Sequence, residues 1–176
     1  MDYYPNIDAV LHFAHECWPL IRSNAPRVTW SIVGRNPPSS VLKLGKIPGI
    51  TVTGSVPDVK PYLAPATVAI APLRIGSGTR LKILEAFAMR KAVVSTSLAC
   101  EGLDVIPGKH LIVADQPEAF ARQVMTLLQD SQGRAALANA GFDLAHAYSW
   151  DLCGNALLSS LRNIIENGLK PLSQDQ

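Results

Sequence analysis

The chain has 176 residues, of which 48% are hydrophobic and 17% charged, and its formal net charge is +2. This composition is typical of one globular domain and excludes a disordered chain, while so small and unclustered a positive charge argues against a nucleic-acid-binding surface. The cysteines, Cys17, Cys100 and Cys153, are too few and too scattered for a disulfide framework or a zinc ribbon.

Neither a signal peptide nor a membrane-spanning segment is predicted. The first residues, MDYYPNIDAV, contain no basic region followed by an apolar one, and the longest apolar runs are of strand length. We therefore expect a cytoplasmic protein, with docking at the inner face of the membrane as the alternative location.

Short apolar stretches rich in β-branched residues alternate with helical patterns along the chain. In chain order these patterns predict a helix over 8–23, a strand over 27–33, a helix over 37–46, a strand over 50–53, a helix over 57–63, a strand over 67–71, a helix over 79–89, strands over 92–96 and 110–114, a helix over 116–129 capped by Asp115, and helices over 131–147 and 150–167.

This alternation predicts an α/β fold: a doubly wound, mostly parallel, Rossmann-like sheet with helices on both faces. Residues 1–169 are expected to form one domain and residues 170–176 a flexible tail. The chain opens with a helix where such a sheet begins with a strand, so the first strand is predicted to be missing. The sheet would then either close directly or be completed by another chain, with self-association as one way to do so.

The densest group of candidate functional residues follows the strand predicted over 67–71. Gly76 and Gly78 permit backbone conformations closed to other residues and let a ligand approach the main chain. Ser77 and Thr79 offer hydroxyl groups, one of which can cap the helix that follows. Free N–H groups and a partial positive charge at the start of that helix attract anions, so the loop predicts a phosphate site.

Two cations and a carboxylate lie in the first turns of the helix after this loop. Arg80 and Lys82 oppose the helix dipole unless an anion lies beside them, which favours a phosphate ligand. Glu85 is placed to accept the two hydroxyls of a ribose, while Ile83 and Leu84 are apolar and expected to face the sheet. The alternative is an ordinary loop followed by an amphipathic helix with solvated charges.

Five short strings carry a family resemblance. They are VTGSVPD at 52–58, KILEAFAM at 82–89, KAVVST at 91–96, LACEGL at 98–103 and YSW at 148–150. In this order they resemble the loop beside the nucleotide base, the donor-site helix, the next strand, the loop after it and the start of the final helix in the C-terminal domain of the retaining glycosyltransferases of family 4. The resemblance covers nearly the whole chain and implies the donor-binding half of a two-domain enzyme.

The resemblance also implies a function for each matched position. Glu85 would bind the ribose hydroxyls, Val56 would lie near the base, and residues 76–79 would lie against the diphosphate and the sugar. Glu101, like Glu85, is interpreted as a ligand of hydroxyl groups and not as an acid or a base. The donor-binding set is completed by the next helix residues, Ile83 and Leu84.

The chain departs from the family pattern at two places. The family often carries a pair of glutamates, and the first of them falls at Ser77 here. It also commonly carries a basic pair near the first strand and helix, where this chain has only residues 2–6. We therefore predict that Arg80 and Lys82 supply the missing charge and act as the catalytic residues that stabilise the leaving diphosphate.

The function expected from the resemblance is transfer of a sugar, with retention of configuration, from a UDP- or GDP-sugar to a glycan or a lipid-linked acceptor. Neither a metal nor another cofactor is expected. The resemblance implies that the N-terminal acceptor-binding domain is absent here, so we expect this domain alone to be inactive. The alternatives are a catalytically silent nucleotide-binding or scaffold module and half of a sugar-nucleotide epimerase.

Overall fold

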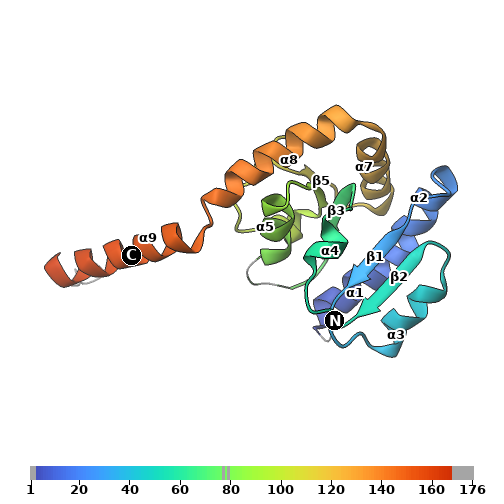
Figure 1. Ribbon diagram of the computed structural model, residues 1–176, viewed down its shortest axis with the longest axis horizontal. Coiled ribbons are helices and arrows are strands. Elements are labelled where there is room, and N and C mark those ends of the chain that lie inside the picture. The colour runs from blue at the N-terminus through green and yellow to red at the C-terminus, as the bar shows by residue number, and fades with distance from the viewer. Residues whose placement is uncertain (1–2, 77, 79, 168–176) are drawn as a thin grey trace, which may run out of the picture.

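Strands alternate with helices along the part of the chain that the computed structural model describes, residues 3–76, 78 and 80–167 (Figure 1). The strands are β1 (Trp30–Val33), β2 (Ile50–Gly54), β3 (Val68–Ala71), β4 (Ala92–Ser95) and β5 (Ile112–Val113). The helices are α1 (Tyr4–His12), the π-helical η1 (Phe13–Cys17), α2 (Trp18–Asn24), α3 (Ser39–Leu42), the 3-10 helix η2 (Lys43–Lys46), α4 (Lys60–Leu63), α5 (Leu81–Ala88), α6 (Ser97–Cys100), α7 (Pro117–Gln129), α8 (Ser131–His146) and α9 (Trp150–Asn167). The predicted α/β class is confirmed.

The strands form two separate parallel sheets. β1 pairs with β2, and the second sheet has the order β3-β4-β5. Among the described residues, β1 and β3 are not paired with each other, although they border the place of the predicted missing strand. Direct closure of the sheet, one of the two predicted outcomes, is therefore wrong.

The first helical region begins earlier than predicted and is not uniform. It starts at Tyr4 and passes through the π-helical segment η1 before continuing as α2. The N–H of Trp18 bonds to the carbonyl of Phe13, five residues back. Because the next residue, Pro19, has no N–H to donate, a wider turn at this point avoids a broken ladder.

Asp115 was predicted to cap the helix over 116–129, and this prediction is wrong. α7 begins after Gln116 with Pro117 in its first turn and has no side-chain cap. Asp115 Oδ1 instead accepts hydrogen bonds from the N–H of Ser97 at 2.8 Å and from its Oγ at 2.9 Å. Asp115 therefore ties the segment after β5 to α6, a helix that the sequence patterns did not predict.

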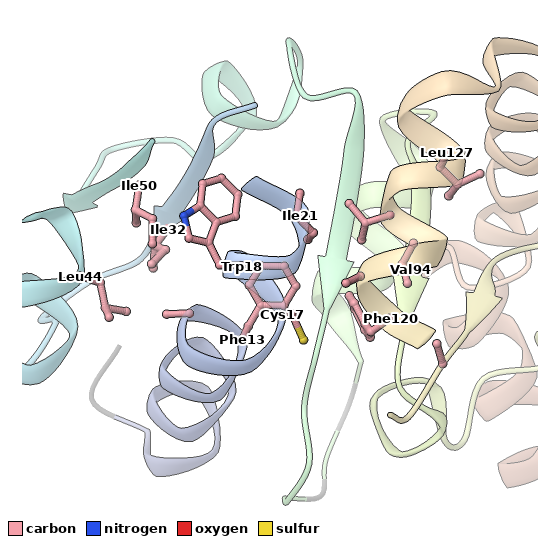
Figure 2. Packing of buried hydrophobic residues seen from close by; sticks show 14 of the residues in the cluster. Phe13, Cys17, Trp18, Ile21, Ile32, Leu44, Ile50, Val94, Phe120 and Leu127 are labelled. Atoms are coloured by element: carbon pink, nitrogen blue, oxygen red, sulfur yellow. The ribbon is translucent and has the colours of Figure 1, made fainter. Parts of the chain in front are cut away.

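Two aromatic side chains from different halves of the molecule meet Phe13. The ring of Phe13 lies 4.6 Å from that of Trp30 in β1 and 5.7 Å from that of Phe120 in α7, both edge-on. In Figure 2, Phe13 projects from η1 into the cluster that Phe120 enters from α7. The helices next to the gap thus join the two sheets through side chains, without strand pairing.

A second core cluster surrounds α5. Phe87 and Ile83 are buried there, at 0% and 1% exposure, against β4 and neighbouring loops. Gly141 of α8 lies so close to Phe87 that an added Cβ would stand 2.5 Å from its ring. This close approach fixes α8 across α5 and so holds the helix that carries most of the predicted site.

α9 projects away from the rest of the molecule (Figure 1). Large apolar side chains on it are exposed, namely Trp150, Leu152, Leu157, Leu158, Leu161, Ile164 and Ile165. None of the helices within the described ranges combines the length and the apolar character needed to cross a membrane. The predicted tail, 170–176, lies outside the described residues.

Candidate functional site

Three segments that are distant in sequence meet at the carboxyl end of β3: the start of α1, the loop after β3 and the start of α5. The backbone of Gly76 has a φ of +106°, and a Cβ on it would stand 2.9 Å from the ring of Pro5. Only glycine satisfies both constraints. The loop can therefore lie directly against the first turn of α1, at the edge where ligands bind in open parallel sheets.

Two polar contacts join the same segments. Arg74 donates two hydrogen bonds to the carboxylate of Asp8, at 2.7 Å from Nη2 and 3.1 Å from Nε. This pairing raises the pKa of Arg74, chiefly through the hydrogen bonds. Lys82 Nζ donates to Asn6 Oδ1 at 2.7 Å. Both contacts hold the first turn of α1 beside the loop and α5.

Lys82 places its ammonium at the meeting point of these segments. Its side chain keeps much of its surface exposed, yet the ammonium group is crowded by protein atoms. This crowding, together with the nearby charge of Arg80, lowers the pKa of Lys82. Because Asn6 is neutral, the hydrogen bond to it leaves the charge of Lys82 uncompensated by that partner.

Arg80, predicted as a catalytic residue that stabilises the diphosphate, is buried at the start of α5. Its side chain is 6% exposed, and its Nη2 lies 3.5 Å from Oε2 of Glu101, which is 70% exposed. Arg80 Nε also donates to the carbonyl of Glu101 at 3.4 Å. The structure thus brings two predicted site residues together, with Arg80 anchoring the start of α5 to the loop after α6.

Glu85 and Lys82 open onto a groove of about 720 Å³ between β1 and β3. Glu85 follows Lys82 by about one helical turn on α5 and is exposed. Leu84 is half-buried, whereas Ile83 is 1% exposed and packs in the core. The predicted contact of Ile83 with the donor would then have to involve its main chain, and it stays a prediction.

The predicted site residues not yet described are Gly78, Val56, Ser77 and Thr79. Gly78 has a φ of +100° and no atom within 4 Å of an added Cβ, so its backbone conformation, and not crowding, requires glycine. Val56 follows the carboxyl end of β2, is half-buried, and is not among the described residues that line the groove beside Glu85. Ser77 and Thr79 lie outside the described residues.

Sequence reasoning missed Asn6, Asp8 and Arg74, which orient the site from the side of α1. Their contacts span 66 and 76 residues of sequence, so no local pattern reveals the pairs. The one available signal was polar side chains in the first turn of the opening helix. Over the described ranges, no group of three or more His, Cys, Asp or Glu could hold a metal ion, and independence from metals stays a prediction.

One family model matches most of the chain. The family model of the glycosyl transferases group 1 matches residues 1–130. An uncharacterized 44.6 kDa protein in the cps region of Klebsiella pneumoniae is 23% identical over 145 residues, which are 78% of this chain and 37% of that protein.

Solved structures share the fold at low identity. Sucrose-phosphate synthase from Thermosynechococcus elongatus superposes with a TM-score of 0.72 and 17% identity over 93% of this chain and 43% of its own. HepE from Anabaena, solved with UDP and glucose, gives a TM-score of 0.69 and 17% identity over 84% of this chain and 44% of its own. The chain therefore spans less than half the length of each of these proteins.

Proposed function

Because this chain belongs to the glycosyl transferases group 1 family, we propose that it is the half of a retaining glycosyltransferase that binds a nucleoside-diphosphate sugar. One observation carries the proposal: Lys82 and Glu85 open side by side onto a groove at the carboxyl end of a parallel strand, next to a glycine loop and a helix N-terminus. A cation and backbone N–H groups suit a diphosphate, and a carboxylate suits ribose hydroxyls.

In the proposed reaction, the bond between the anomeric carbon and the diphosphate breaks while negative charge builds on the leaving group. Lys82 and the start of α5 would stabilise that charge without a metal. Arg80 is a weaker candidate for direct contact, because it is buried and pairs with Glu101. We propose that it positions the start of α5 and adds positive potential to the site.

The chemical class of the donor is supported by the solved relatives. HepE was solved with UDP and glucose, so a UDP-sugar, with a GDP-sugar as the alternative, is the proposed substrate. We propose that the sugar is transferred to a glycan or a lipid-linked acceptor during the assembly of a polysaccharide. The Klebsiella pneumoniae relative, which is named for the cps region, supports this acceptor class. Location in the cytoplasm, at the inner face of a membrane, is part of the same proposal.

The acceptor side of the cleft is proposed to come from a separate N-terminal domain. The relatives are more than twice as long as the segment that this chain matches in them. The 176-residue chain alone should then bind the nucleotide but not transfer the sugar.

Calorimetry on matched lysine variants tests the assignment of Lys82. Lys82→Met should weaken UDP binding by about 1.5–3 kcal/mol, the range for a hydrogen bond to a charged group. Lys46→Met, on η2 and exposed, removes the same charge elsewhere and should leave the affinity unchanged. Equal affinities for wild type and Lys82→Met would remove Lys82 from the site.

The companion test concerns Glu85. Glu85→Gln keeps the shape of the side chain but weakens acceptance of two hydroxyl groups, so UDP should lose affinity while inorganic diphosphate does not. Glu118→Gln, an exposed change in the first turn of α7, is the control. If UDP and diphosphate lose affinity equally, Glu85 does not bind the ribose.

A further inference from the structure

Three cationic side chains near the carboxyl end of β3 and the start of α5 differ in the charge of their partners. The two arginines are each paired with a carboxylate, at 2.7 Å from Arg74 and 3.5 Å from Arg80. Lys82 Nζ donates instead to the side-chain amide of Asn6, at 2.7 Å from Oδ1. Of these three cations, Lys82 is therefore the one that is held by a neutral partner.

The amide of Asn6 belongs to a turn that is fixed by contacts on either side of it. The N–H of Asn6 donates to the carbonyl of Tyr3 at 3.0 Å. Pro5, one residue earlier, packs against the glycine loop, and Asp8, two residues later, is ion-paired at 2.7 Å with the segment after β3. The amide oxygen is thus placed by the first turn of α1, whereas Lys82 reaches it through a flexible four-carbon side chain.

This hydrogen bond lies at the wall of the groove that the donor is proposed to enter. Asn6, Lys82 and Glu85 line the same groove. An ammonium group has three N–H donors, and the bond to Asn6 uses one of them. An anion in the groove would then meet an ammonium whose position is already fixed, so that binding would not have to immobilise a long side chain at the cost of its conformational entropy.

The neutrality of the amide matters as much as its position. A carboxylate at position 6 would accept the same hydrogen bond, but it would also neutralise Lys82 and repel an anionic ligand. An apolar side chain there would leave the ammonium without this anchor. The amide oxygen of Asn6 holds the ammonium without cancelling its charge.

We propose that Asn6 is a positioning residue for donor binding, whose amide oxygen holds the Lys82 ammonium at the groove with its positive charge available to the diphosphate. The inference rests on the proposed function, because it requires that Lys82 binds this group. It adds a residue from α1 to a site that the sequence pattern placed on the loop after β3 and on α5.

A double-mutant cycle tests whether Asn6 acts through Lys82. Calorimetry with inorganic diphosphate compares wild type, Asn6→Ala, Lys82→Met and the double variant. Asn6→Ala should weaken binding by about threefold to tenfold when Lys82 is present and by less than about twofold in the Lys82→Met background. No loss in Asn6→Ala, or an equal loss in both backgrounds, would overturn the proposal, because Asn6 would then act without Lys82.

The isosteric change Asn6→Asp tests the role of neutrality. It keeps the acceptor but adds a negative charge, and it should weaken diphosphate binding by about tenfold or more. Asn139→Asp is the matched control. Asn139 is exposed on α8, its Oδ1 accepts from Arg90 Nη1 at 2.8 Å, and neither residue is among the described residues that line the groove. Wild-type affinity in Asn6→Asp would overturn the proposal.

A spectroscopic readout separates positioning of Lys82 from a general effect on the fold. The ¹³C resonance of the Lys82 ε-methylene group, identified by its loss in Lys82→Met, should shift in Asn6→Ala and stay in place in Asn139→Ala. An unshifted resonance in Asn6→Ala would overturn the proposal.

The same measurements distinguish failure of this inference from failure of the proposed function. A wild-type chain that binds neither UDP nor diphosphate would overturn both. If Lys82→Met weakens binding while Asn6→Ala binds diphosphate as wild type does, this inference alone is wrong.

Discussion

At the scale of single residues, the two helical glycines Gly141 and Gly154 differ in how much space surrounds them. At Gly141, a Cβ would stand 2.5 Å from the buried ring of Phe87, whereas at Gly154 it would meet nothing within 4 Å. Gly141 is thus required by the contact between α8 and α5. Gly154 lowers the helix propensity of α9 without a packing benefit.

This contrast gives a matched pair of substitutions. Gly141→Ala should destabilise the protein by about 1–3 kcal/mol, as overpacking of a filled core does. Gly154→Ala should be neutral or stabilise by up to about 1 kcal/mol. Urea unfolding followed by circular dichroism measures both, and equal effects of the two changes would mean that α8 does not pack on α5 as described.

His110 is a buried histidine whose ring acts as an acceptor. Its Nδ1 accepts from the N–H of Ile106 at 3.0 Å, and burial, with a smaller effect of Lys109, lowers the pKa of His110. A strand was predicted over 110–114, but the structure places the strand only at Ile112–Val113 and His110 in the turn before it. The side-chain bond to Ile106 adds to the backbone bonds that the N–H groups of Lys109 and His110 donate to the carbonyl of Ile106 in that turn.

The lowered pKa predicts a pH dependence with a definite sign. Below the unfolded value of about 6.5, the unfolded chain takes up a proton that folded His110 resists, so stability falls as pH drops through that value. His110→Asn retains an acceptor at the same position and should reduce the loss of stability between pH 7.5 and about pH 5.5. His12, whose pKa burial also lowers, should account for part of what remains. An unchanged pH profile in His110→Asn would show that His110 contributes nothing to it.

At the scale of elements, the strands and most helices could be predicted because their apolar spacing is local. The π-helical turn at Phe13–Cys17 and the contact of Asp115 with Ser97 could not, because they depend on neighbours distant in sequence. The loop at Gly76 and the start of α5 were predicted as a site from residue types together with the family resemblance, and the site stays a prediction. The burial of Arg80 against Glu101 was not predicted, because an arginine at a helix start is equally compatible with solvent.

Helix α9 differs from the other long helices in carrying its apolar residues exposed. Leu161 in α9 is 46% exposed, whereas Leu137 in α8 is 5% exposed. Leu161→Ala should therefore change the free energy of unfolding by less than about 0.5 kcal/mol, and Leu137→Ala should lower it by about 2–5 kcal/mol. Chemical unfolding of the two variants checks this difference. A large loss in Leu161→Ala would mean that α9 packs against the chain.

At the scale of the whole molecule, the edge strands β1 and β3 of two parallel sheets lie on opposite sides of a groove. The helices beside this groove hold the two sheets together. Phe13 contacts both halves, through Trp30 and Phe120, so one of the two core clusters spans both sheets although the strands do not pair. The same arrangement aligns the carboxyl ends of β1 and β3 with the start of α1. The proposed donor site lies at this edge, where Lys82 and Glu85 open onto the groove.

A crystal structure of the chain with UDP tests the donor-binding proposal most directly. The predicted result is a diphosphate within hydrogen-bonding distance of Lys82 and of backbone N–H groups between Gly76 and the start of α5, with the ribose hydroxyls on Glu85. A nucleotide bound elsewhere, or one whose ribose lies away from Glu85, would contradict the account.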